Sequence, residues 1–258
     1  MSDTQSGSID LAIDGPIATI TINRPQVRNS IDLAAAERLS KVIEQIEESG
    51  SIRVGIITGA GNIAFSAGAD LRARARGEAR AVFPPYGFAG FVRRPRKKPF
   101  IAAVNGYAVG GGLEIAMACE LVVAAPNATF SLPEPLRGLI AGGDCLPLAL
   151  ARLPVSVAWD VALTGRRISA EEALRYGMVN AVAEDVQGAA RELAQRVMSG
   201  APKAVEGTIE MMRHLLPRTG PTYDELTESI QQRLFKTNDA KEGSAAFLEK
   251  RDPIWSNS

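Results

Sequence analysis

Short apolar segments separated by stretches with helical spacing constrain the fold of this chain most. Residues 54–58, 100–104 and 121–125 are short and apolar, and residues 128–131 form a further short segment. Strands without a polar face are typical of parallel sheets covered by helices. Parallel neighbours also need long crossovers, which the intervening helical stretches supply. The chain is therefore expected to fold as an α/β protein.

The regions on either side of these strands extend the pattern. Around Asp14-Gly15, residues 9–13 and 17–22 alternate between apolar and polar side chains, which predicts a β-hairpin. Helices are expected over residues 30–48, from the capping box at 169–172 to Gly177, and over residues 202–215, 223–234 and 239–250. A soft boundary near Gly200 divides the chain into a core, residues 1–200, and a C-terminal helical region, residues 201–258.

Composition argues against several classes of protein. The 258 residues carry 29 basic and 29 acidic side chains, and zero net charge is unlike a protein that mainly coats nucleic acid or anionic membrane. Two cysteines outside any CxxC motif and a single histidine, His214, argue against a disulfide framework or a metal site. Acid–base chemistry would then depend mainly on carboxylates. No signal-peptide pattern and no apolar run of membrane length is visible, so a cytoplasmic protein is expected.

Two glycine-rich turns are candidates for binding a ligand through the backbone. Ala67-Gly68-Ala69 follows the 54–58 strand, and Gly110-Gly111-Gly112 precedes an apolar helical stretch with Glu114 in its first turn. Small residues let the backbone approach a ligand, and N–H groups at a helix N-terminus lack partners within the helix. Close packing alone would also explain each turn.

A second carboxylate completes the candidate site. Glu134 follows the 128–131 strand and lies between Pro133 and Pro135, which restrict its backbone. Taken alone, Glu134 is also explained as a surface loop residue. With the two turns, however, the chain offers two N–H groups for one oxygen and two carboxylates beside it. Proton transfer next to a carbonyl needs this combination, because the N–H groups stabilise the enolate oxygen.

Other patterns are weaker. Gly59-Ala-Gly61 after a strand lacks the third glycine of a dinucleotide-binding turn, and Ser66 lacks the glycine that opens a nucleophile elbow. The basic run 93–98 is interpreted as a solvated face, with attraction of ligand phosphates as the alternative. The segment 72–98 as a whole is irregular, as in mobile lids and in plain surface loops.

Several motifs in this order resemble the crotonase (enoyl-CoA hydratase/isomerase) superfamily. They run over nearly the whole chain: Ile20-Thr-Ile-Asn-Arg-Pro25, Arg28-Asn-Ser, Ser66-Ala-Gly-Ala-Asp-Leu71, residues 101–112, Leu132-Pro-Glu134 and Ala246-Phe-Leu-Glu-Lys-Arg251. The resemblance implies a spiral of ββα units with a C-terminal α-helical region that builds homotrimers or homohexamers. It implies an acyl-CoA thioester substrate, with no metal and no cofactor besides the coenzyme A of the substrate.

The resemblance also assigns residues. The oxyanion N–H groups would be those of Ala69 and Gly111. Coenzyme A would contact residues that match the family pattern, namely Arg28, Ala67, Asp70, Leu71, Arg72, Phe247 and Lys250, while the backbone of Gly142 would help to hold a water molecule. Both hydratase carboxylates are present, with Glu114 activating water for attack at Cβ and Glu134 exchanging the proton at Cα. The implied reaction is reversible hydration of a trans-2-enoyl-CoA, in fatty acid or related acyl-CoA metabolism.

Departures from the family pattern leave the acyl group open. Ala141 replaces a usual proline, and Asp144 and Cys145 follow Gly142-Gly143, so Asp144 could signal a polar acyl group. Residues 163–167 and 242–255 are similar to the carnitinyl-CoA dehydratases, the alternative hydratase. Isomerase and acyl-CoA hydrolase reactions are further alternatives within the superfamily. A non-catalytic RNA-binding member that uses the basic run is the alternative of another class.

Overall fold

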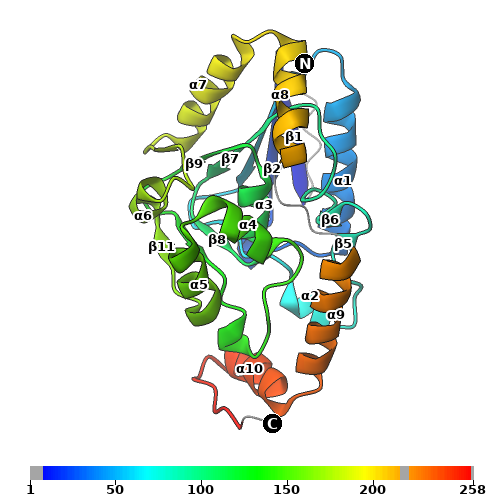
Figure 1. Cartoon of the computed structure of the whole chain (residues 1–258), viewed down its shortest axis with the longest axis vertical. Coiled ribbons are helices and arrows are strands. Elements are labelled where there is room, and N and C mark those ends of the chain that lie inside the picture. Colours follow the sequence, from blue (N-terminus) through cyan, green and yellow to red (C-terminus); the bar gives the residue numbers. More distant parts are fainter. Residues whose placement is uncertain (1–7, 216–220, 257–258) are drawn as a thin grey trace.

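The β-hairpin at the start of the computed structural model, which describes residues 8–215 and 221–256, forms one edge of its larger sheet (Figure 1). β1 (Ile9–Asp14) pairs antiparallel with β2 (Ile17–Ile22), and Gly15 makes the turn with a φ of 55°. A positive φ favours glycine because it has no Cβ. The hairpin predicted from the alternating pattern is confirmed.

Each successive pair of strands then contributes one strand to each of two sheets. The larger sheet has the order β1-β2-β3-β7-β9-β12 and the smaller one β11-β10-β8-β4. The pairs are β3 (Val54–Gly59) with β4 (Ala64–Ser66), β7 (Phe100–Val104) with β8 (Tyr107–Val109), and β9 (Leu121–Ala124) with β10 (Thr129–Ser131). Short end strands are β11 (Ile168–Ser169) and β12 (Ala181–Val182).

Parallel pairing joins β2, β3, β7, β9 and β12, and also β4, β8 and β10. Each strand pair leads into a helix or a 3₁₀ turn: α2 (Leu71–Ala75), α3 (Gly111–Ala118), and η2 (Pro135–Arg137) before α4 (Cys145–Arg152). The chain therefore winds as a spiral of ββα units, as expected. The segment between α2 and β7 adds a small hairpin of β5 (Val82–Phe83) and β6 (Gly87–Phe88).

Two apolar layers hold the sheets to their helices. One lies between the larger sheet and α7 (Val186–Met198), where Ile56 and Ile101 meet Ala190 and Ala194. The other and larger layer contains α1 (Leu33–Glu48), α3 and both sheets, with Phe65 and Phe130 fully buried. The first turn of α1 is capped by Asp32, whose side chain accepts from the Ala35 N–H.

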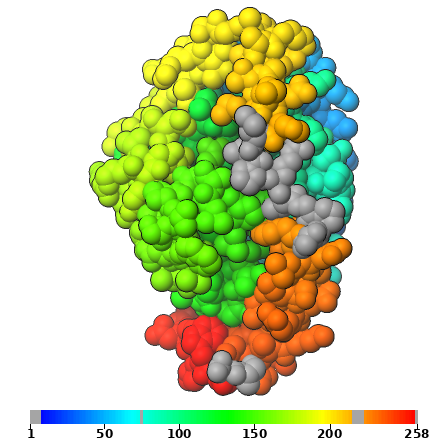
Figure 2. All heavy atoms as spheres, viewed as in Figure 1, coloured from blue at the N-terminus to red at the C-terminus, as the bar shows by residue number. Residues whose placement is uncertain are grey.

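The remaining helical elements are one short turn near the N-terminus and five helices in the second half of the chain. They are η1 (Pro25–Val27), α5 (Val155–Thr164), α6 (Ala170–Arg175), α8 (Pro202–Leu215), α9 (Pro221–Phe235) and α10 (Asn238–Glu249). Ser169 and Glu172 form the predicted capping box of α6. α9 runs beside the segment of α3 and α4 on the face shown in Figure 2, and α10 lies beneath it. The three C-terminal helices begin where they were expected, while the division into two domains stays a prediction.

Candidate active site

Glu114 lies in the first turn of α3 and is almost completely buried. Its Oε1 accepts a hydrogen bond from the backbone N–H of Asp144 at 2.7 Å. The approach depends on Gly143, which has a φ of 59° and where a Cβ would overlap the Glu114 carboxyl group. Burial raises the pKa of Glu114 to about 8, against a smaller lowering by the Asp144 N–H. The carboxyl group therefore exchanges protons near neutral pH.

Glu134 stands at the N-terminal end of η2, where Pro135 opens the turn. Burial raises its pKa, because the charged form loses its hydration. Its Oε2 is buried and has no hydrogen-bond partner within the described part of the chain. A buried carboxylate oxygen without a partner is costly, so the position suits a group that binds a substrate or a water molecule.

Gly110 and Cys145 link the two carboxylates. Oε1 of Glu134 lies 2.7 Å from where a Cβ at Gly110 would stand, and the Glu114 N–H donates to the Gly110 carbonyl at 3.0 Å. The Cys145 Sγ lies 3.9 Å from the same carbonyl oxygen. Its thiol has a raised pKa, mainly from burial and then from the charges of Glu114 and Glu134. Glu114 and Glu134 thus both lie near Gly110 and Cys145, and their joint catalytic role stays a prediction.

The two candidate oxyanion turns also meet. A Cβ at Gly68 would stand 2.7 Å from the Gly111 nitrogen, so the chain needs glycine there for the turns to touch. Ala69 is exposed, and its neighbours Gly68 and Asp70 are the residues that bond to Ile31. Neither Ala69 nor Gly111 donates its N–H in any hydrogen bond recorded between described residues. Between described residues, neither N–H group thus has a recorded protein acceptor, which the predicted oxyanion role requires.

A charged network that the sequence did not predict surrounds Glu114. The Arg93 Nε pairs with the Asp144 carboxylate, and its two Nη atoms donate to Asp224 on α9 at 2.6 and 2.7 Å. Tyr223 lies close enough for the charges of Asp144 and Glu114 to contribute to its raised pKa, after burial as the main cause. The available signal was the spacing of polar residues 223, 224, 227, 228 and 231, which places them on one side of α9.

Gly142 lies against the same helix. A Cβ there would overlap the Nε2 of Gln231, and the Gln231 Oε1 accepts from the Arg80 guanidinium at 2.8 Å. The Gly142 carbonyl accepts the Cys145 N–H at 3.3 Å. The role of Gly142 in holding a water molecule stays a prediction. Gln231 on α9 is the residue that faces Gly142.

The predicted coenzyme A contacts divide into two groups. Leu71 and Phe247 line one cavity of about 370 Å³, together with Arg137, Leu139, Phe235, Ala240, Lys241, Ser244 and Leu248. The Phe247 ring lies 4.4 Å from the Arg137 guanidinium carbon. Lys250 ends α10 in a left-handed conformation and is exposed. The cavity therefore joins residues 176 positions apart in sequence.

The other predicted contacts lie at the turn before α2. Arg28 and Arg72 are exposed, and the Arg28 carbonyl accepts the Ala67 N–H at 3.0 Å. Asp70 is buried, pairs with Arg24, and accepts from the backbone N–H groups of Arg72 and Ala73. The Asp70 carboxylate thus holds the start of α2, while Arg28 and Arg72 keep their charges available at the surface.

The interpretation of the basic run 93–98 as a solvated face is wrong for most of its cations. Arg94 and Arg96 are buried, and the Arg96 guanidinium carbon lies 3.9 Å from the Phe91 ring centre. The Lys98 ammonium donates to carbonyls at the end of α1. Lys97 alone among these basic side chains is exposed. The run is used inside the fold, which leaves little of it for RNA.

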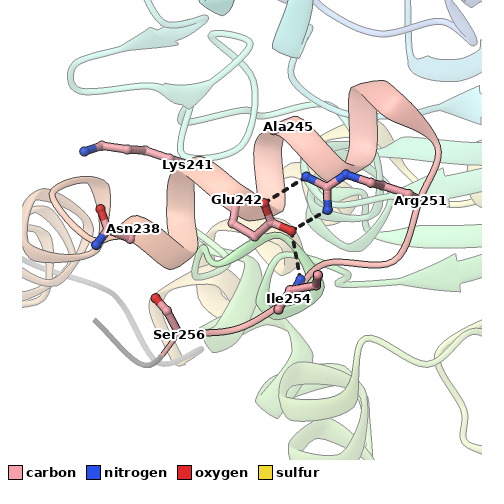
Figure 3. Close-up of a pocket in the computed structure, with 7 residues that line it drawn as sticks. All are labelled: Asn238, Lys241, Glu242, Ala245, Arg251, Ile254 and Ser256. Carbon is pink, nitrogen blue, oxygen red and sulfur yellow. Dashed lines mark hydrogen bonds and ion pairs between the residues drawn. The ribbon is translucent and has the colours of Figure 1, made fainter.

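A hollow of about 590 Å³ lies against α10 and the C-terminal segment, and it shares Lys241 with the cavity of Leu71 and Phe247. Figure 3 shows its floor, where Arg251 pairs with Glu242 and the Ile254 N–H donates to the same carboxylate at 2.8 Å. Within the described residues no three His, Cys, Asp or Glu side chains gather as a metal site would require. None of the helices in the described ranges has the length and apolar character needed to cross a membrane.

Comparison with known proteins supplies the family. A model described as enoyl-CoA hydratase/isomerase matches residues 12–258. A carnitinyl-CoA dehydratase of Salmonella paratyphi B is 41% identical over 97% of this chain and 98% of its own. A carnitinyl-CoA hydratase structure from Mycobacterium avium has a TM-score of 0.91 at 39% identity, covering 98% of this chain and all of that one.

A further solved structure, enoyl-CoA hydratase EchA1 from Mycobacterium marinum, is 40% identical with a TM-score of 0.79, again over 98% of this chain and all of that one. The mixed α/β fold with its C-terminal helices agrees with these matches. The chain belongs to the enoyl-CoA hydratase/isomerase (crotonase) family and is an enzyme of its hydratase and dehydratase, or hydro-lyase, type.

Proposed function

We propose that this enzyme adds water reversibly across the double bond of a trans-2-enoyl-CoA, with Glu114 and Glu134 as the acid–base pair. The observation that carries the proposal is that two carboxyl groups of raised pKa lie near Gly110, next to the contact between the turns of Gly68 and Gly111. Carboxyl groups whose pKa lies near the working pH exchange protons effectively with a substrate. An enolate oxygen between two N–H donors is stabilised by roughly 3–4 kcal/mol for each donor.

The steps follow from the placement of the groups. Glu114 takes a proton from water as its oxygen bonds to Cβ, and the double-bond electrons move to the thioester oxygen. The N–H groups of Ala69 and Gly111 bind that oxygen. Glu134, whose Oε2 has no described protein partner, then delivers a proton to Cα as the thioester carbonyl re-forms. In the reverse direction the same groups exchange roles, so dehydration uses the same site.

Coenzyme A is proposed to bind through the turn before α2 and the cavity that contains Leu71 and Phe247. The cavity offers apolar side chains and the cations Arg137 and Lys241, which suits a ligand with both an apolar arm and phosphates. Arg28 and Arg72 at the surface and Lys250 at the end of α10 are proposed as further contacts with the coenzyme. No cofactor beyond the coenzyme A of the substrate is part of the proposal.

The acyl group is proposed to be short and polar, with a carnitinyl-type substituent as the specific candidate. α9 turns Tyr223, Asp224 and Gln231 toward the site, where a fatty acyl chain would need apolar neighbours. Asp144 and Asp224 share one cation, Arg93, which leaves net negative charge for a cationic substituent. The carnitinyl-CoA dehydratase at 41% identity supports the same acyl class.

A homotrimer or homohexamer is also proposed. Apolar side chains on the C-terminal helices are exposed in the single chain, including Met211, Met212, Leu226 and Leu248, and contact with further copies would cover them. A role in cytoplasmic acyl-CoA metabolism remains a prediction from the resemblance. Light scattering tests the assembly, and a monomer would contradict it.

A panel of thioesters tests the reaction. Crotonyl-CoA, a long-chain enoyl-CoA and crotonobetainyl-CoA are compared by loss of enoyl absorbance, and release of free thiol is measured in parallel. Hydration with crotonobetainyl-CoA preferred is the expected result, whereas thiol release would favour a hydrolase. Glu114→Gln and Glu134→Gln should each lower turnover at least about a hundredfold with little change in thioester binding. Near-normal turnover in either variant would refute the acid–base assignment.

A further inference from the structure

Asp144 links Glu114 to a charged contact with α9. Its backbone N–H donates to Oε1 of Glu114 at 2.7 Å, while its carboxylate pairs with the Arg93 Nε. Arg93 in turn donates two hydrogen bonds to Asp224 in the first turn of α9. We propose that Arg93 is a positioning residue for the reaction, which holds Asp144 and thereby the N–H that orients Glu114, with Asp224 holding Arg93 from α9. The inference rests on the proposed role of Glu114.

The peptide that bonds Glu114 needs such support because of its neighbours. Ala141, Gly142 and Gly143 precede Asp144, and these small residues have almost no side chain with which to fix the backbone. Gly143 cannot be replaced by a larger residue without meeting the Glu114 carboxyl group. After these three small residues, Asp144 has the first side chain that can hold the peptide, and its carboxylate pairs with Arg93.

Arg93 is itself fixed on several sides. Its backbone N–H donates to the Tyr86 carbonyl at 2.9 Å, and its aliphatic stem lies over Gly87, where a Cβ would be only 3.2 Å from Cγ. The guanidinium group donates to Asp144 through Nε and to Asp224 through both Nη atoms. Bridging two carboxylates with separate edges requires the planar fork of arginine, which a lysine ammonium does not reproduce.

The charge of Arg93 also acts on Glu114. The titratable groups facing that carboxyl group are Asp144 and Cys145 from α4, Arg93, Tyr223 from α9, and Glu134 on the opposite side through Cys145. The negative charge of Asp144 raises the pKa of Glu114, and the positive charge of Arg93 lowers it. Loss of the cation leaves Asp144 uncompensated, so the Glu114 pKa should rise further above about 8.

A second ion pair provides a control that distinguishes positioning of Glu114 from simple docking of α9 against the rest of the protein. Arg80, from the same segment as Arg93, pairs with Glu228, one helical turn after Asp224. No contact of Glu228 with Asp144 or Glu114 is recorded among the described residues. Asp224→Asn and Glu228→Gln each remove one carboxylate charge from the exposed side of α9. The two variants are therefore a matched pair, and only Asp224→Asn breaks the connection to Glu114.

The experiment measures turnover against pH for Arg93→Met, Arg93→Lys, Asp224→Asn and Glu228→Gln, using the enoyl-CoA on which the unaltered enzyme is most active. Arg93→Met should lower kcat at least about tenfold, with KM changed less than about threefold. The limb of its pH profile that reports ionisation of Glu114 should move to higher pH by about half a unit or more. Arg93→Lys should not restore kcat, Asp224→Asn should show a smaller loss of the same kind, and Glu228→Gln should match the unaltered enzyme.

An unchanged kcat together with an unmoved Glu114 limb in Arg93→Met would overturn the inference. So would equal losses in Asp224→Asn and Glu228→Gln, because the effect would then come from docking of α9. If Arg93→Met fails to fold by circular dichroism, the comparison of Asp224→Asn with Glu228→Gln decides alone. Glu114→Gln serves as the benchmark: normal turnover there refutes the proposed function, whereas an inactive Glu114→Gln beside a fully active Arg93→Met refutes only the role of Arg93.

Discussion

Glu114→Gln should stabilise the folded protein in a pH-dependent way while it removes activity. The folded pKa of about 8 lies above the ordinary value of 4.5, because burial penalises the charged form. The stability associated with this group is therefore complete below about pH 4.5 and is lost as the pH rises through about 8. The shift corresponds to about 3 kcal/mol at pH 7 and about 5 kcal/mol at pH 9, since each pH unit between the two pKa values costs about 1.4 kcal/mol.

Glutamine is neutral at every pH and keeps an oxygen that can accept the Asp144 N–H. By calorimetry, the variant should melt near the unaltered protein at pH 5 and roughly 6–12 °C above it at pH 7, at about 2–4 °C for each kcal/mol. Glu44→Gln, at an exposed position on α1, is the control and should show no such trend. A Glu114→Gln variant that is less stable, or whose advantage does not grow with pH, would refute the reasoning.

Further predictions concern the N–H groups, the pH profile and the thiol. Gly111→Pro should abolish turnover, whereas Gly111→Ala, which meets the same Phe88 ring but keeps its N–H, should retain at least about tenfold more; equal activities would contradict the oxyanion assignment. The kcat/KM profile for hydration should rise with pH through a limb near pH 8, where Glu114 loses its proton and can act as the base, and a flat profile from pH 6 to 9 would be inconsistent. Cys145→Ser should keep the fold but shift that limb, since the thiol bonds Glu114, and an unmoved limb would show that the thiol is inert.

Local patterns were enough to predict the elements that carry the fold. The alternation around Gly15, the apolar strand at 100–104 and the capping box at Ser169 each follow from spacing and backbone preferences, and each is confirmed. The order of the strands in two sheets is a property of the winding of the chain. It became predictable through the family motifs rather than through periodicity.

The candidate site was predictable in part for the same reason. The glycine turns and Glu134 are visible because prolines and glycines mark unusual backbone conformations. Arg93 was hidden in a basic run whose composition resembles a solvated face, and its partner Asp224 lies 131 positions later in a helix expected to serve assembly. Pairing at that separation depends on how α9 returns to the core, which no local pattern encodes.

The difference between Glu114 and Glu120 shows why burial alone does not identify an acid–base residue. Glu114 is buried and Glu120 is half-buried, and both lie within one short stretch of chain. Glu120 accepts from the Arg213 guanidinium and the Phe100 N–H and lies 3.5 Å from Arg96, so its pKa is lowered despite burial. It stays charged and joins α8 to the sheet.

Glu114, by contrast, accepts one backbone N–H, and the charge of Arg93, which pairs with Asp144, lowers its pKa less than burial raises it. Burial therefore dominates, and the pKa of Glu114 rises. Removing the Glu120 charge should therefore destabilise the fold by leaving Arg96 buried with less compensation, whereas removing the Glu114 charge should stabilise it. The same mutation, glutamate to glutamine, thus has opposite effects on stability at two sites six residues apart. Under the proposed mechanism, the proton that Glu114 holds near neutral pH is the one that it gives to the departing hydroxyl group in dehydration.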